Sequence, residues 1–153
     1  MKKVGFTIGK FAPLHKGHEY LMEKGMQEMD EFYVVVYETD LIDIPLAKRG
    51  KWIEDLYPGV KILYAINPPS KYGLDPESIN IQMEYLSGII KKLNPTHFYS
   101  SEKYGEHVAK YLQIQEVLVD KARVNIPISA SKIRQNIEEY KVYLSEIVYK
   151  ELL

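Results

Sequence analysis

Short apolar runs alternate with segments of helical periodicity along almost the whole chain. The apolar runs predict strands at residues 4–8, 32–37, 61–66, 97–100 and 116–119. Helical patterns are found at residues 17–29, 46–56, 79–93, 102–112 and 131–153, and we expect the last of these to be interrupted. Strands that alternate with helices in this way are typical of βαβ units, in which the strands pair in parallel.

The predicted fold class is therefore α/β: a Rossmann-like open parallel sheet of about five strands, with helices on both faces and a C-terminal helical segment. Several runs are continuously apolar, as expected for strands that are buried on both sides. A chain of 153 residues has the length of one domain, which we expect to span residues 1–153. In the C-terminal segment, residues at helical spacing predict a face that packs on the core: Tyr140, Tyr143, Leu144, Ile147 and Val148.

The composition narrows the classes of partner. The formal net charge is −1, so no general positive field attracts nucleic acid or a membrane surface, and a polyanion must be held locally. The chain has no cysteine, which excludes disulfides and thiolate metal sites. It shows neither an apolar run that could span a bilayer nor a signal-peptide pattern. We expect a cytoplasmic protein with no nucleic-acid or membrane partner, and homo-oligomer formation stays open.

Residues 9–18, which read GKFAPLHKGH, combine a strand end, a glycine-containing turn and the start of a helix. Free backbone N–H groups and the helix dipole at such a start favour a bound phosphate. His15 and His18 are three residues apart and would project from one face of the first turn as further donors. Gly9 would allow the backbone close to a ligand, and Gly17 would leave room beside the helix start. The alternative is a generic turn with incidental surface histidines.

A second segment of similar character, PISASKIR, occupies residues 127–134. Ser129 or Ser131 can cap a new helix, and Arg134 lies one turn inside it on the face of Ser131. Hydroxyl groups and a guanidinium at a helix start would hold a second phosphate. For this pattern alone, a capped helix with a surface arginine is the commoner explanation.

Together the two segments resemble the nucleotidylyltransferase superfamily that carries the HxGH signature. Residues 9–18 match its GxFxPxHxGH motif, and residues 128–134 match its ISx[ST]xxR motif. Within the superfamily, the chain resembles the nicotinamide-nucleotide adenylyltransferase domain of bifunctional NAD-biosynthesis regulator proteins. That further similarity lies in residues 44–52, 99–102 and 117–123.

The resemblance implies adenylyl transfer from ATP to nicotinamide mononucleotide, which gives NAD and pyrophosphate. Since the acceptor phosphate is already anionic, this chemistry needs charge neutralisation and positioning more than a strong base. Mg²⁺ is implied as a cofactor that binds through the ATP phosphates, with no metal ligands assigned in the chain. The implied catalytic residues are Lys10, His15, His18 and Arg134.

The nucleotide is implied to lie between the ends of the first and fourth strands, with the adenine near Ser100, Asp120 and residue 128. Ordinary capping of strand ends is the alternative role of Ser100 and Asp120. The full set of implied nucleotide-binding residues is Gly9, Phe11, Gly17, Ser100, Asp120, Ile128, Ser129 and Ser131.

The prediction of the residues that contact the acceptor depends on fewer positions. Arg49 and Trp52 share one helix face, and the resemblance implies that they contact the substrate; the alternative has Trp52 in the core and Arg49 in solvent. Related enzymes usually carry a tryptophan, thought to stack on the nicotinamide, where this chain has Leu86. Tyr85, or Tyr72 from the preceding loop, is the candidate for that aromatic face.

The departure at Leu86 keeps two other functions open. One is transfer to a different acceptor of the same superfamily, such as phosphopantetheine, a polyol phosphate or flavin mononucleotide. The other is a sensor that binds NAD or ATP without turnover. A long irregular segment at residues 67–78 contains three prolines and is either a binding loop or a plain surface excursion. His97 and His107 are isolated, and we expect an ordinary strand residue and a surface helix residue.

Overall fold

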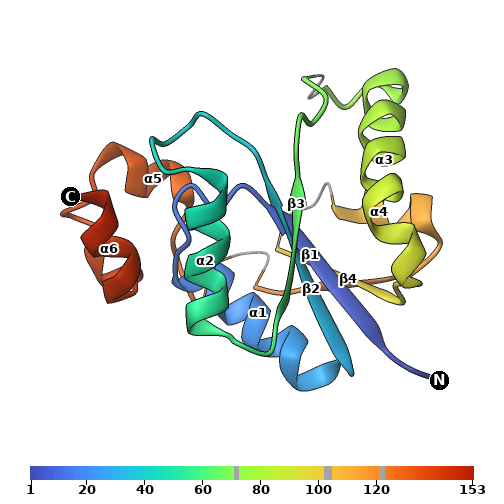
Figure 1. Ribbon diagram of the computed structural model, residues 1–153, viewed down its shortest axis with the longest axis horizontal. Helices are drawn as coiled ribbons and strands as arrows, with labels where there is room; N and C mark the ends of the chain where they lie inside the picture. Colours follow the sequence, from blue (N-terminus) through green and yellow to red (C-terminus); the bar gives the residue numbers. More distant parts are fainter. Residues whose placement is uncertain (71–72, 102–104, 121–122) are drawn as a thin grey trace.

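The computed structural model describes residues 1–70, 73–101, 105–120 and 123–153. Within these ranges five parallel strands form one open sheet in the order β3-β2-β1-β4-β5 (Figure 1). The predicted fold class is confirmed, and each strand begins and ends within one residue of its predicted bounds. The strands are β1 (Val4–Gly9), β2 (Glu31–Tyr37), β3 (Lys61–Ala65), β4 (His97–Ser100) and β5 (Gln115–Leu118).

Helices cover both faces of the sheet. In Figure 1, α1, α2 and the C-terminal helices lie on one side of the strands, and α3 and α4 lie on the other. None of the helices in the described ranges is long and apolar enough to cross a membrane. The helices are α1 (Lys16–Glu28), α2 (Leu46–Leu56), α3 (Pro76–Ile90), α4 (Gly105–Leu112), α5 (Ala130–Gln135) and α6 (Glu146–Leu152), with 3₁₀ turns at Lys91–Leu93 and Lys141–Tyr143.

The starts of α1, α2 and α5 lie within one residue of their predicted positions. Helix α3 begins three residues early, because Asp75 accepts the N–H of Ser78 at 3.1 Å and Pro76 occupies the first helical position. Helix α4 is described from Gly105, and residues 102–104 of its predicted range lie outside the described residues.

The predicted interruption of the C-terminal helix is confirmed. Helix α5 ends at Gln135, and the side chain of Asn136 then accepts the N–H of Glu139 at 3.1 Å, so the chain turns before α6. Leu144 and Val148 are buried in the core, and the other apolar positions predicted for this stretch are partly buried against it. Packing on the core is thus confirmed, although a 3₁₀ turn and a short helix provide it instead of one continuous helix.

Strand β2 lies between two apolar layers. Its residues Phe32, Val34 and Val36 pack in the cluster that contains α1, α2 and the C-terminal segment. Tyr33 and Val35 point the other way, into the cluster formed with α3 and α4. Burial on both faces explains why this strand reads as a continuous apolar run.

The order of the strands creates a place for a ligand. The chain passes outward from β1 through β2 to β3, and then crosses back through α3 to β4 on the other side of β1. Connections therefore leave β1 and β4 in opposite directions, which opens a crevice beyond their carboxyl ends.

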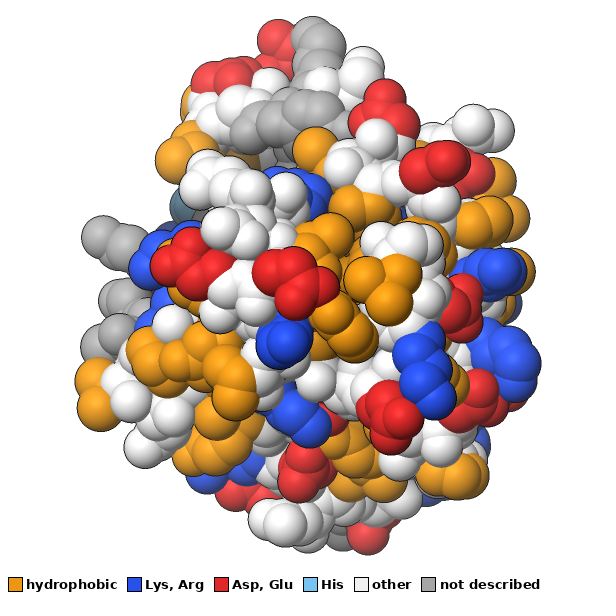
Figure 2. Space-filling model, turned by 90° about the vertical axis from the view of Figure 1, so that its left-hand side faces the viewer, with side chains coloured by type: hydrophobic (Ala, Val, Ile, Leu, Met, Phe, Trp, Pro, Cys, Tyr) orange, Lys and Arg blue, Asp and Glu red, His pale blue; other side chains and the backbone are white. Residues whose placement is uncertain are grey.

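On the face that carries the C-terminal helices, acidic and basic side chains are mixed and no single basic patch forms (Figure 2).

Candidate nucleotide site

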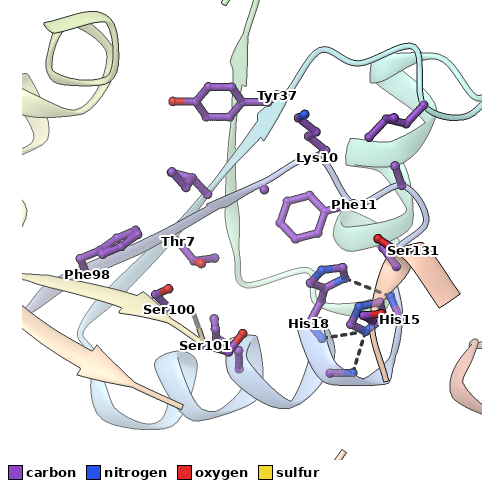
Figure 3. A pocket seen from close by; sticks show the side chains of 18 of the residues that line it. Thr7, Lys10, Phe11, His15, His18, Tyr37, Phe98, Ser100, Ser101 and Ser131 are labelled. Atoms are coloured by element: carbon purple, nitrogen blue, oxygen red, sulfur yellow. Dashed lines mark hydrogen bonds between the residues drawn. The ribbon is translucent and has the colours of Figure 1, made fainter. Parts of the chain in front are cut away.

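A cavity of about 590 Å³ opens at the carboxyl ends of the strands. Thr7 of β1, Tyr37 of β2 and Phe98 of β4 contribute to its wall, so it lies at the crevice between diverging connections (Figure 3). Most residues predicted for the site line this cavity: Gly9, Lys10, Phe11, His15, Gly17, His18, Tyr85, Ser100, Asp120, Ser129, Ser131 and Arg134.

His15 and His18 cap the start of α1 with their own side chains. His15 is the N-cap residue, and its Nδ1 accepts the N–H groups of Gly17 at 3.0 Å and His18 at 3.4 Å. In return, Nδ1 of His18 accepts the N–H of His15 at 3.2 Å, and the two rings stack with centroids 3.7 Å apart (Figure 3). This is a reciprocal capping box made of two imidazoles. The backbone N–H groups expected to bind phosphate are therefore partly occupied by the histidines.

The capping box fixes the chemical form of both rings. A nitrogen that accepts an N–H bears no proton, so the proton of each neutral ring is on Nε2. Burial first, and then the positive charge of Arg123, lowers the pKa of His15 from 6.5 to about 4. Burial, the neighbouring His15 and Arg123 hold the pKa of His18 well below 6.5. At neutral pH the pair therefore presents two Nε2–H donors and no general base.

The depressed pKa of His15 predicts a pH-dependent stability. The unfolded chain binds a proton at this histidine below pH 6.5, whereas the folded protein does so only near pH 4. Stability is therefore lost as the pH falls from 6.5 to 4, by on the order of 3 kcal/mol for this residue. Asparagine is a good N-cap that does not titrate, so a His15→Asn variant should lose less stability over this range. Urea unfolding at several pH values measures the difference, and parallel curves for the two proteins would contradict it.

The glycines of the first motif make room for aromatic rings. A Cβ on Gly9 would lie 2.9 Å from the ring of Phe11, which itself adopts a left-handed φ of 49° and is buried over the strand end. A Cβ on Gly17 would lie 2.8 Å from the ring of His15. The room predicted at Gly17 is confirmed, and its physical reason is the capping ring. At Gly9, a side chain would collide with the ring of Phe11, so Phe11 is the reason for this glycine. The ring of Phe11 meets that of His18 edge-on, with centroids 4.8 Å apart.

The second motif reaches the same cavity from α5. Ser129 caps the helix by accepting the N–H of Lys132 at 3.4 Å, which decides between the two serines proposed for this role. Arg134 donates to the hydroxyl of Ser131 at 3.4 Å, as their shared helix face predicts, and to the carbonyl of Ala12 at 2.8 Å. The second bond joins the two motifs, which are more than a hundred residues apart in the chain.

Asp120 holds the loop that follows β5. Its Oδ1 accepts the N–H groups of Val124 at 2.9 Å and Asn125 at 3.0 Å, and its Oδ2 accepts that of Ile126 at 2.8 Å. These hydrogen bonds lower the pKa of the carboxyl group. The alternative role of strand-end capping therefore accounts for the contacts of Asp120, and direct contact with the nucleotide stays a prediction.

Arg123 brings a cation into this wall. It lines the cavity, donates to the carbonyl of Ile128 at 2.5 Å, and its charge acts on both His15 and His18. The N–H of Ile128 donates to Ile126 at 2.9 Å, and its side chain is buried in the core. The side chain of Ile128 is thus a core group and its carbonyl supports Arg123, while contact of this residue with the nucleotide stays a prediction.

The comparisons with known proteins agree with this geometry, although no family model matches the chain. The trifunctional NAD biosynthesis/regulator proteins NadR of Salmonella typhimurium and Escherichia coli are 28% and 30% identical to it, over 94% of this chain. The chain spans 39% of the length of each of these curated relatives. A solved NadR protein in complex with NAD and AMP-PNP has a TM-score of 0.69 at 23% identity, and the match covers 96% of this chain and 46% of that one. These homologues match the resemblance to the nucleotidylyltransferase superfamily.

The resemblance carried by the two end motifs is thus confirmed. A putative nicotinate-nucleotide adenylyltransferase from Vibrio parahaemolyticus shares the fold over 99% of both chains, with a TM-score of 0.64 at 14% identity. Because this identity is low, the match supports the fold of the chain and not the identity of its acceptor.

Two residues predicted to contact the acceptor are buried away from the cavity. Trp52 is 1% exposed and packs in the core, as in the alternative explanation of its helix face. Arg49 is also 1% exposed, contrary to both explanations. Its guanidinium donates to the carbonyls of Lys10, Tyr37 at 2.9 Å and Ile44 at 3.1 Å. The substrate contacts of Trp52 and Arg49 are therefore corrected to packing and to support of the backbone.

Tyr85 lies at the cavity, and its contact with an acceptor stays a prediction. It lines the cavity, its hydroxyl donates to the carbonyl of Ile66 at 2.5 Å, and its ring lies 6.2 Å from that of Tyr37. Leu86, in contrast, is buried among α3 and its neighbours. The other aromatic candidate, Tyr72, lies outside the described residues, as do residues 102, 121 and 122 of the similarity to the regulator proteins.

Several candidate site residues were missed from sequence. Tyr37 ends β2 and Glu38 follows it. Both line the cavity because the carboxyl ends of parallel strands share one edge of the sheet, a signal that could have found them. His107 lines the cavity, although it reads as a surface helix residue. The proline-rich loop is a cavity wall, since Pro68, Pro69, Gly73 and Leu74 line it.

Proposed function

We propose that this chain transfers the adenylyl group of ATP to nicotinamide mononucleotide, which yields NAD and pyrophosphate. One observation carries the proposal: a buried, neutral histidine pair with its Nε2–H groups available lies in one cavity with Lys10, Arg123 and Arg134. The relatives named as NAD biosynthesis proteins support nucleotide substrates, and the solved NadR complex contains NAD and an ATP analogue.

In this reaction an oxygen of the acceptor phosphate attacks the α-phosphorus of ATP. The bond from that phosphorus to the bridging oxygen breaks, and pyrophosphate leaves with the electron pair. The attacking phosphate is already anionic, so no proton has to be removed. A site that presents the histidine pair as hydrogen-bond donors beside several cations suits such a displacement, because its difficulty is the negative charge that gathers in the transition state.

The residues divide into groups by their position. His18 and His15 would donate to the α-phosphate and its neighbour through Nε2–H. Arg134, with Ser131 and the α5 N-cap Ser129, would bind the β- and γ-phosphates that leave. The bonds from Arg134 to Ala12 and Ser131 hold its guanidinium plane in place before the substrate arrives.

Mg²⁺ would enter with ATP as part of the substrate, where it neutralises phosphate oxygens. The potential metal ligands in the cavity are consistent with an ion that enters together with ATP. The carboxylates among its described lining residues are Glu38 and Asp120, and the oxygens of Asp120 already accept three backbone N–H groups. We therefore propose that phosphate and water, not a carboxylate cage, coordinate the ion.

The acceptor would lie towards β2 and α3. Tyr85 and Tyr37 offer an aromatic wall for a pyridine ring, which would replace the tryptophan that related enzymes have at position 86. Lys10, which lines the same side in Figure 3, would bind the acceptor phosphate.

Pyrophosphate release with ATP and Mg²⁺ tests the function. We expect release with nicotinamide mononucleotide to exceed that with phosphopantetheine or flavin mononucleotide, and reactions without acceptor give the background. Release with another acceptor alone would keep the mechanism and overturn the substrate. Tight binding of NAD without any release would instead indicate a sensor.

A further inference from the structure

The described wall of the cavity contains one carboxylate with an oxygen that is open to a ligand. Of the two carboxylates on its described wall, Asp120 follows β5 and is occupied by the backbone of its loop. Glu38 follows β2, three strands away in the sheet. It therefore belongs to the half of the cavity where Tyr37 and Tyr85 form the wall, away from the histidine pair and the two arginines.

The backbone around Glu38 holds this side chain in place. Its own N–H donates to the carbonyl of Ala65 at 3.1 Å, and its Oε1 accepts the N–H of Asn67 at 2.5 Å. The described residues give its Oε2 no hydrogen bond and form no ion pair with it. Its negative charge acts on Arg49, whose guanidinium is already bonded to three carbonyls. A fixed negative charge with one unbonded oxygen thus borders the acceptor half of the cavity.

We propose that Glu38 makes this site selective for the carboxamide form of a pyridine mononucleotide over its carboxylate form. The inference rests on the proposed function and adds the basis of acceptor choice. A carboxamide N–H can donate to Oε2. The positively charged pyridinium ring is common to both forms, so its attraction to the same carboxylate does not discriminate between them. A nicotinate group would place a second carboxylate there, with repulsion and no proton to share. Attraction of one acceptor and repulsion of the other both act through this one side chain.

The test compares two acceptors in three proteins. Glu38→Gln removes the charge and keeps an oxygen that can accept the N–H of Asn67. Asp40→Asn makes the same charge change two residues further along, at an exposed position that does not line this cavity, and is the matched control. For each protein, calorimetry gives the Kd of nicotinamide and nicotinate mononucleotide, and pyrophosphate release gives kcat/KM for both.

We expect the wild-type protein to prefer the amide, and Glu38→Gln to reduce that preference by at least about tenfold, mainly through better use of the acid. Asp40→Asn should keep the wild-type ratio. An unchanged ratio in Glu38→Gln, or a wild-type preference for the acid, would overturn the role of Glu38 while leaving adenylyl transfer intact. Binding of both mononucleotides without pyrophosphate release from either would overturn the proposed function, and the ratio of Kd values would still test Glu38.

Discussion

A His18→Gln variant should release pyrophosphate about a hundredfold or more slowly than the wild-type protein, with little change in the KM for ATP. Loss of one preorganised donor to a transition-state oxyanion typically costs that much in kcat. The expected split between kcat and KM follows because the donor is needed most when charge gathers on the α-phosphate, and less in the ground state.

Glutamine is the informative replacement because His18 has two roles. Its Nδ1 accepts the N–H of His15 in the capping box, and its Nε2–H is the proposed donor. Glutamine is a common residue at this position of a capping box and can accept the same N–H, but it does not provide the imidazole Nε2–H. His18→Ala loses both groups and should also be less stable.

Two controls complete this experiment. His97→Gln changes a histidine whose Nδ1 lies 2.8 Å from the hydroxyl of Thr96 and which does not line the cavity, so its kcat should match that of the wild-type protein. Thermal unfolding of His18→Gln should resemble that of the wild type. If kcat and ATP binding fell by the same factor, His18 would be a uniform binder of ATP, and its transition-state role would be wrong.

The features that sequence could predict are local ones. Strand β2 is apolar on both faces because both faces are buried. The strand can therefore be predicted from its continuous apolar run, without knowledge of the rest of the fold. His15 and His18 fall within one helical turn, and their proximity follows from spacing alone. Their capping role was not readable, since an N-cap is normally a small polar residue and the direction of an imidazole depends on the Gly17 backbone.

The features that sequence missed depend on contacts between distant segments. Arg123 acts on the histidines only because the loop after β5 folds over α1, with Asp120 holding it. The burial of Arg49 also depends on contacts between distant segments. An arginine three residues before a tryptophan on an amphipathic helix predicts solvent exposure or ligand contact, and neither is found. Its acceptors come from the ends of β1 and β2 and from the segment before α2, which only the folded chain brings together.

An Arg49→Met variant should therefore be less stable than the wild-type protein, by about 2–4 kcal/mol in the free energy of unfolding. Methionine fills much of the same volume but leaves the carbonyls of Lys10, Tyr37 and Ile44 without their donor. A buried carbonyl that loses its partner costs about 1–3 kcal/mol. The net loss is smaller than three such terms, because the variant no longer has to bury a guanidinium.

Urea unfolding at neutral pH measures this loss, and Lys51→Met is the matched control. Lys51 is a cation two residues further along the same helix and forms an exposed ion pair with Asp55 at 3.0 Å. Such surface pairs contribute about 0–1 kcal/mol, so the control should stay close to the wild type. Arg49→Lys should recover only part of the stability, because a single ammonium cannot reproduce the planar fork that reaches three carbonyls.

The Arg49→Met variant should also lose activity, although Arg49 lines no part of the main cavity. Its bond to the Lys10 carbonyl fixes the turn that carries Lys10 and Phe11, and its bond to Tyr37 fixes the strand end before Glu38. Release of these two ends should therefore weaken binding of the acceptor more than that of ATP, which lies towards the histidines and Arg134. A variant that is destabilised but retains wild-type KM for the acceptor would restrict Arg49 to folding, and unchanged stability would contradict its role in both.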